Sequence, residues 1–104
     1  MTHTVHEFTK MYECDAAETI IAYPNKVCIQ MIILYFNDAG DNIKITDAAS
    51  GMVGETTDDT IVDLYAAVNK DTIVIDWSAK PRSVRGLKIA AITANDCKAF
   101  IYLA

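Results

Sequence analysis

The run from Val27 to Phe36 constrains the fold of this chain more than any other segment. Nine of its ten residues are apolar, and Gln30 is the only polar one. Side chains alternate between the two faces of a strand, so a strand here is apolar on both faces. A small antiparallel sheet normally needs only one apolar face for its core. Strict alternation gives one face Val27, Ile29, Met31, Ile33 and Tyr35, and the other Cys28, Ile32, Leu34 and Phe36.

The length and composition fit one domain with extensive buried contacts. A chain of 104 residues supports a single core, and a hydrophobic content of 52% is high for a domain of this size. We expect an extended N-terminal arm or edge strand over residues 1–16 and a single domain over residues 17–104. The last strand, Cys97 to Leu103, is also apolar or aromatic on both sides. Either another element or a neighbouring subunit must cover these second faces.

Two features of the sequence bear on the compartment. No segment approaches the roughly 18 apolar residues of a membrane-spanning helix, so we expect no membrane partner. Residues 1–7 lack the basic start and apolar stretch of a secretory signal, so we expect folding in a cytoplasm rather than secretion by a signal peptide.

Charge is unevenly distributed along the chain. Residues 1–37 hold four acids and two bases, residues 38–76 hold nine acids and two bases, and residues 77–104 hold one acid and five bases. These counts suit a solvated surface, or complementary patches on neighbouring subunits that set register. Neither interpretation fits nucleic-acid binding, which requires a clearly basic footprint.

Short apolar or alternating segments recur between turn residues, at the spacing typical of all-β domains. We expect a strand at 18–23, a turn at Pro24-Asn25, and a further short strand at 52–56. The whole pattern predicts an all-β antiparallel β-sandwich of about eight strands, a number that also allows a jelly roll.

Residues 60–68 fit two kinds of element. Ile61, Leu64, Tyr65 and Val68 fall at helical spacing, while the alternating pattern predicts a strand. We favour the strand, because the neighbouring segments are all β, and keep a short helix as the alternative.

Residues 23–102 resemble a family of small all-β proteins of tailed-phage virions. The pattern comprises Ile-Thr-Asp-Ala-Ala-Ser-Gly at 45–51, Thr-Ile-Val-Ile-Asp-Trp at 72–77, and Val-Arg-Gly-Leu-Lys-Ile at 84–89. An aromatic terminal strand at 100–102 completes it. The shared feature is an order of strands and turns rather than a chemical motif. The residues alone leave open whether the protein is viral.

The resemblance implies a capsid cement or decoration subunit, or a related fibre domain. Such a protein is made in the host cytoplasm, resides in the virion, forms a homo-oligomer, often a trimer, and clamps neighbouring capsid proteins. We expect the partner-facing residues to come from the two-faced strands, from the Pro-Arg loop and from the N-terminal arm. The candidates are Leu34, Phe36, Phe100, Tyr102, Arg82, Arg85, Val5 and Phe8.

We find no pattern of an enzyme, a cofactor site or a metal site. The four glycines form no phosphate-binding loop, and no Gly-x-Ser-x-Gly elbow occurs. The only histidines, His3 and His6, have no Cys or carboxylate at ligand spacing to complete a zinc site. The alternative function is a carbohydrate- or receptor-binding β-sandwich, with a site formed by Trp77, Tyr102 or Tyr65.

Overall fold

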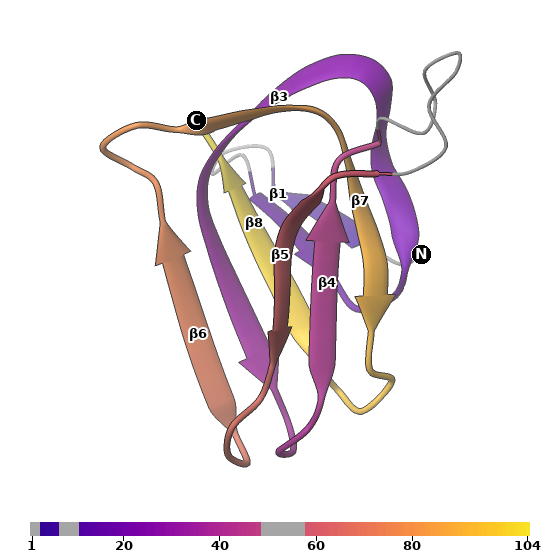
Figure 1. The fold of residues 1–104 in the computed structure, drawn as a ribbon, viewed down its shortest axis with the longest axis vertical. Helices are drawn as coiled ribbons and strands as arrows, with labels where there is room; N and C mark the ends of the chain where they lie inside the picture. Colours follow the sequence, from indigo (N-terminus) through magenta and orange to yellow (C-terminus); the bar gives the residue numbers. More distant parts are fainter. Residues whose placement is uncertain (1–2, 7–10, 49–57) are drawn as a thin grey trace.

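The computed structural model describes residues 3–6, 11–48 and 58–104, and these residues form strands, turns and loops without a helix (Figure 1). The described strands are β1 (His3–His6), β2 (Met11–Cys14), β3 (Glu18–Phe36), β4 (Asn42–Thr46), β5 (Thr60–Tyr65), β6 (Asp71–Asp76), β7 (Arg82–Ile92) and β8 (Lys98–Leu103). The strand predicted at 52–56 lies outside the described residues.

The described strands form one open antiparallel sheet in the order β1-β2-β8-β3-β7-β4-β5, and β6 pairs with β3. The prediction of an all-β antiparallel fold is confirmed, and hydrogen bonds join the described strands into a single sheet. Residues 60–65 form β5, which pairs with β4 from Asn42↔Tyr65 to Thr46↔Thr60. The strand interpretation of this segment is therefore confirmed, and the helical alternative is wrong.

Strand β3 runs through the position where the sequence predicted a turn. It continues from Glu18 to Phe36, and the Tyr23–Pro24 peptide bond within it is cis. The ladder between β3 and β7 shifts register between Ile21 and Lys26. Proline has no N–H to donate, and bulges are where strands tolerate it. The turn prediction is wrong because Pro24 occupies an irregularity of the strand rather than its end.

A second irregularity at Gln30 changes which side chains of β3 face the core. The ladder with β8 shifts between Ile29 and Met31, because Ile29 lies opposite Leu103 and Met31 lies opposite Tyr102. One extra residue reverses the alternation of side chains beyond it. The core therefore receives side chains from both predicted faces of the run: Val27, Ile29, Ile32, Leu34 and Phe36.

The sheet curls so that its two ends enclose one core. In Figure 1, β4 and β5 lie in front of β8 and the second half of β3. Buried residues from both groups belong to one hydrophobic cluster, among them Ile45 of β4, Val62 of β5 and Ile101 of β8. Burial of this apolar surface is the main favourable term that holds the two ends of the curled sheet against each other.

Gly86 allows β3 and β7 to approach closely at their shared irregularity. Its φ is +76°, and a Cβ added there would lie 2.5 Å from the Cβ of Ala48 and 3.0 Å from the carbonyl oxygen of Ile21. The backbone N–H of Ala48 donates to the carbonyl oxygen of Arg85 over 3.1 Å, which fixes the chain after β4 beside β7. Only glycine combines this φ with this proximity.

Strands β1 and β2 lie at one edge of the sheet. His3–His6 pairs with Met11–Cys14, which in turn pairs with β8. Cys14 is fully buried in the core cluster. Residues 11–14 are thus integral to the sheet, while the boundary predicted after residue 16 stays a prediction.

The buried carboxylate of Asp41 connects the turn between β3 and β4 with the turn between β7 and β8. Asp41 is 7% exposed, and its Oδ2 accepts hydrogen bonds from the Asp38 backbone N–H at 2.9 Å and from Asn95 Nδ2 at 3.1 Å. The Cys97 thiol also donates to it, over 3.2 Å. Because buried polar groups are costly without partners, these three donors explain how Asp41 is tolerated there.

Candidate functional site

The half of the sheet formed by β2, β8, β3 and β6 carries apolar side chains on its outward side. Directly opposed residues of antiparallel strands share a face. Ile33 lies opposite both Phe100 of β8 and Val74 of β6. The cross-strand pairing defines the outward apolar face: Met11, Met31, Ile33, Tyr35, Val74, Phe100 and Tyr102.

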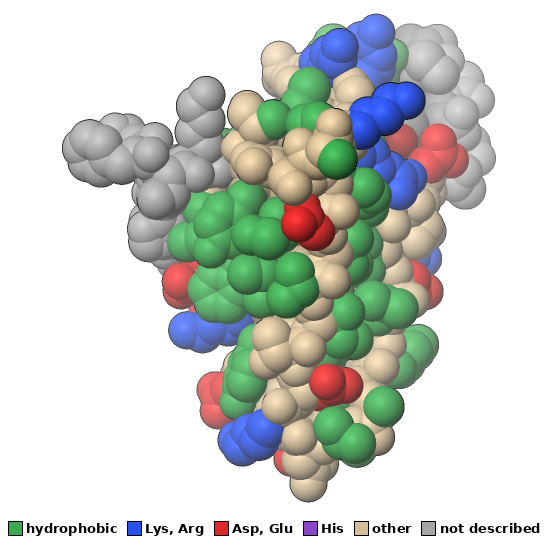
Figure 2. All heavy atoms as spheres, turned by 90° about the vertical axis from the view of Figure 1, so that its left-hand side faces the viewer, with side chains coloured by type: hydrophobic (Ala, Val, Ile, Leu, Met, Phe, Trp, Pro, Cys, Tyr) green, Lys and Arg blue, Asp and Glu red, His purple; other side chains and the backbone are tan. Residues whose placement is uncertain are grey.

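These side chains are accessible to different degrees and do not form part of the core. Val74 is 56% exposed, whereas the other six are half-buried. The hydrophobic core cluster and the side chains packed against it include none of the seven. Figure 2 shows hydrophobic side chains gathered on the β6 side of the molecule.

The outward side of the opposite half of the sheet is polar by comparison. There Lys44 of β4 lies opposite Asp63 of β5, and Asn42 lies opposite Tyr65. The Asn42 amide donates to Asp63 Oδ1 over 2.9 Å. One outward side of the curled sheet is thus suited to water, and the other is suited to a protein contact.

Charged residues border the outward apolar face. Lys98 Nζ lies 3.7 Å from Glu13 Oε2, and this ion pair spans β8 and β2. Asp76 lies opposite Met31 on the β6 side. A polar rim around an apolar centre is the usual anatomy of a protein interface.

The structure places the predicted interface residues in different parts of the molecule. Phe100 and Tyr102 lie on the outward apolar face. Leu34 and Phe36 are fully buried in the chain's own core, which corrects their assignment as partner-facing residues: the bulge at Gln30 turns both side chains inward. Val5 lies in β1, and Phe8 lies outside the described residues.

Arg82 and Arg85, the remaining candidates, line a cleft of about 570 Å³ at the bend of β3. Its walls come from β3, the start of β7, the chain after β4 and the approach to β5. We call it the bend cleft, and its lining residues are Tyr23, Lys26, Asp47, Asp59, Ile61, Arg82, Ser83, Val84 and Arg85.

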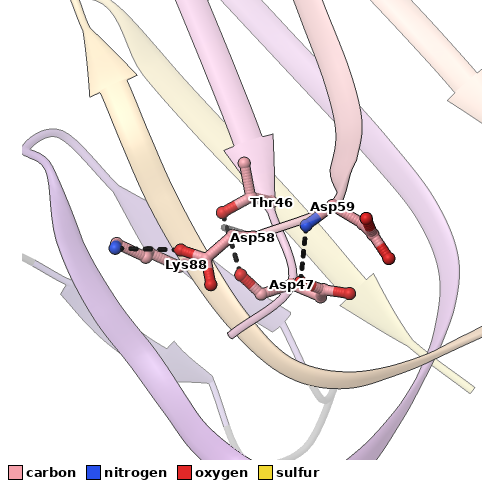
Figure 3. Close-up of polar contacts among 5 residues, drawn as sticks. All are labelled: Thr46, Asp47, Asp58, Asp59 and Lys88. Carbon is pink, nitrogen blue, oxygen red and sulfur yellow. Dashed lines mark hydrogen bonds and ion pairs between the residues drawn. The ribbon is translucent and has the colours of Figure 1, made fainter. Parts of the chain in front are cut away.

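Figure 3 shows the acidic wall of the bend cleft, where the chain leaves β4 and enters β5. The Asp59 backbone N–H donates to Asp47 Oδ1 over 2.9 Å, and the Asp47 N–H donates to the Asp59 carbonyl oxygen over 3.0 Å. The Thr46 hydroxyl donates to the Asp47 carbonyl oxygen, and Lys88 pairs with Asp58 at 3.0 Å. These contacts hold the chain in place, and none of them uses the Asp59 carboxylate.

The aromatic residues of the alternative site do not form one platform. The Arg82 guanidinium lies 5.5 Å from the centre of the Trp77 ring, so a cation already stacks on that ring. Tyr65 is 66% exposed on β5, and Tyr102 lies on β8, which three strands separate from β5 in the sheet order. The geometry therefore favours a contact surface over an aromatic ligand platform.

Two further observations concern the possible metal ligands and one thiol of the described residues. Residues 3–6, 11–48 and 58–104 contain no cluster of three or more His, Cys, Asp or Glu side chains that could hold a metal ion. Burial, with smaller contributions from neighbouring acids, raises the pKa of Cys14 to about 12, so its thiol stays protonated at neutral pH. Across the same ranges there is no helix that could cross a bilayer.

Comparison of the chain with protein-family models, with curated proteins and with solved structures gave no match in any of the three.

The sequence analysis missed several members of both surfaces. Met11, Met31, Ile33 and Val74 join Phe100 and Tyr102 only through cross-strand register, which no single segment displays. The polar residue within the apolar run, Gln30, was the available signal for a change of face. The acidic wall of the bend cleft depends on a contact between Asp47 and Asp59, the two ends of the connection between β4 and β5, which the sequence pattern does not display.

Proposed function

We propose that this chain is a structural assembly subunit that uses the outward apolar face to contact other subunits. The particular role we propose is capsid cement or decoration in a tailed-phage virion, as the resemblance of residues 23–102 implies. In this role the curled sheet acts as an antiparallel β-sandwich. The subunit forms a homo-oligomer, for which we propose a trimer, and attaches to a capsid or another virion protein.

The outward apolar face carries this proposal. Seven large side chains gather there, outside the core, while the opposite outward side carries Lys44, Asp63 and Asn42 beside the exposed Tyr65. Leaving such a patch in water is unfavourable, and apolar patches with polar rims commonly mark contact sites. The patch also explains the high apolar content of a chain that fills its core with other residues.

Attachment to a shell is tested by co-sedimentation. The purified chain is mixed with capsids that lack accessory proteins. These capsids come from the phage whose genome encodes the chain, or from a phage with a similar genome. We expect saturable co-sedimentation and detection of the chain in purified particles by mass spectrometry. Absence from particles, together with no co-sedimentation, contradicts the virion role.

A further inference from the structure

Two backbone irregularities meet at the bend cleft and give it its shape. The register of β3 against β7 shifts between Ile21 and Lys26, and Gly86 with φ +76° faces that shift from β7. Close packing of Gly86 on Ala48 holds the chain after β4 at this point. Binding sites are usually formed in advance in this way, and a volume of about 570 Å³ suits a small molecule.

Two cations lie side by side at the cleft, on adjacent strands. Lys26 of β3 lies directly opposite Arg85 of β7, so both side chains share one face. Like charges in this arrangement repel each other. Both side chains are exposed, and the structure of the described residues contains no ion pair for either. An anion bound between them removes the repulsion.

A third cation is held in position by an aromatic ring. Arg82 stacks over Trp77 at 5.5 Å and also lines the cleft. Stacking limits the freedom of the guanidinium, whose planar N–H groups match the oxygens of a phosphate or carboxylate. Figure 2 shows Lys and Arg side chains gathered at the upper end of the molecule, where Figure 1 places the β6–β7 connection and the bend of β3.

The cleft also carries two acids, which narrow the class of ligand that it can bind. Asp47 and Asp59 line the cleft together with the three cations. Carboxylates accept hydrogen bonds from hydroxyl groups but repel a simple anion. We propose that the bend cleft binds a small hydroxylated anion, namely a sugar phosphate or sugar acid. Lys26, Arg82 and Arg85 hold its charged group, and Asp59 accepts hydrogen bonds from its hydroxyls.

An NMR titration of the whole chain tests this proposal without depending on assembly. The probes are glucose 6-phosphate and glucuronate, with inorganic phosphate and glucose for comparison. We expect saturable shifts at residues around the cleft with both hydroxylated anions below about 10 mM. Binding should be at least several-fold tighter than that of inorganic phosphate, and glucose should cause no comparable shifts.

A matched pair of variants assigns the binding to the cleft. Arg85→Gln removes a cleft cation and should weaken glucose 6-phosphate binding by at least about tenfold, as expected for a charge-assisted contact. Lys98→Gln removes a cation from the rim of the outward apolar face and should leave binding unchanged. Spectra without ligand confirm that both variants are folded.

Four results overturn the proposal. The first is no saturable shift with either hydroxylated anion. The second is binding of inorganic phosphate as tight as that of glucose 6-phosphate. The third is glucose 6-phosphate binding that survives Arg85→Gln. The fourth is that cleft resonances of the free protein shift on dilution, since this makes the cleft a contact between copies of the chain.

Discussion

Ile33 of β3 lies directly opposite Phe100 of β8 on the outward side of the sheet, while the next residue, Leu34, lies opposite Ala99 on the core side. Successive residues of one strand thus serve different purposes. Leu34 is fully buried, whereas Ile33 is half-buried and lies outside the core cluster. This separation allows the fold and the proposed assembly to be tested independently.

Substitution on the outward side should disrupt assembly and spare the fold. We expect the double variant Ile33→Thr with Phe100→Thr to weaken self-association by at least about tenfold, since it removes two apolar side chains from the proposed contact surface. Threonine keeps a high strand propensity, so the monomer should lose no more than about 1 kcal/mol of unfolding free energy. Sedimentation velocity measures the first effect, and urea unfolding of dilute protein measures the second.

The control for this variant is Leu34→Ala. It removes a fully buried side chain, so it should cost about 2–5 kcal/mol of unfolding free energy. If the double variant retained the wild-type sedimentation coefficient, the outward apolar face would take no part in self-association.

Deletion of Gln30 should prevent folding. Without the extra residue, either Val27 and Ile29 or the group beginning at Ile32 must turn away from the core. The loss should exceed about 5 kcal/mol, which is comparable with the whole stability of a small domain. Gln30→Ala keeps the residue count and should change stability by no more than about 0.5 kcal/mol, because its side chain is exposed. Far-UV circular dichroism and urea unfolding distinguish the two; a folded deletion variant contradicts the bulge.

The sequence predicted the strand content well, because alternation and turn residues are local signals. It missed the continuity of β3, since Pro24 followed by Asn25 is ordinary turn chemistry and only a partner strand reveals a bulge. The same limit explains the error at Leu34 and Phe36. Their face depends on one extra residue at Gln30, and strict alternation along the sequence cannot show it.

Gly86→Ala should be more harmful than Gly40→Ala. Both glycines have positive φ, which costs an alanine about 1–2 kcal/mol. At Gly86 the added Cβ also meets Ala48 at 2.5 Å, whereas Gly40 has open space within 4 Å. Adding the cost of overpacking, we expect a loss of about 2–5 kcal/mol for Gly86→Ala against about 1–2 kcal/mol for Gly40→Ala. Thermal and urea unfolding measure both, and equal losses would contradict the close approach of β7 to the chain after β4.

Stability should fall in acid partly because of Asp41. The Asp38 backbone N–H lowers the pKa of Asp41 most, and the Cys97 thiol and Asn95 amide add to this, while burial opposes them. A pKa lower in the folded state contributes stability that is fully present above the unfolded value of about 3.9. That contribution is lost as the pH falls through the folded value.

We therefore expect the urea midpoint of the wild type to fall more steeply below about pH 4 than that of Asp41→Asn. The matched control is Asp15→Asn, which replaces an exposed acid and should follow the wild-type curve. Parallel pH profiles for wild type and Asp41→Asn would show that Asp41 does not contribute in this way.

The candidate surfaces were predictable only in part. The aromatic residues of the last strand, Phe100 and Tyr102, stood out because no polar residue alternates with them after Lys98. The basic residues Arg82 and Arg85, which the structure places at the start of β7, also stood out by charge. The sequence could not show that Lys26 lies opposite Arg85, because a register across a bulge is set by tertiary packing.

The native mass of the wild-type chain tests the proposed assembly most directly. Sedimentation equilibrium over a range up to about 100 μM should give a discrete multiple of 11.5 kDa, and three times that mass for the proposed trimer. A mass of 11.5 kDa at every concentration would show that the outward apolar face does not drive self-association, and would contradict the homo-oligomer on which the proposed function rests.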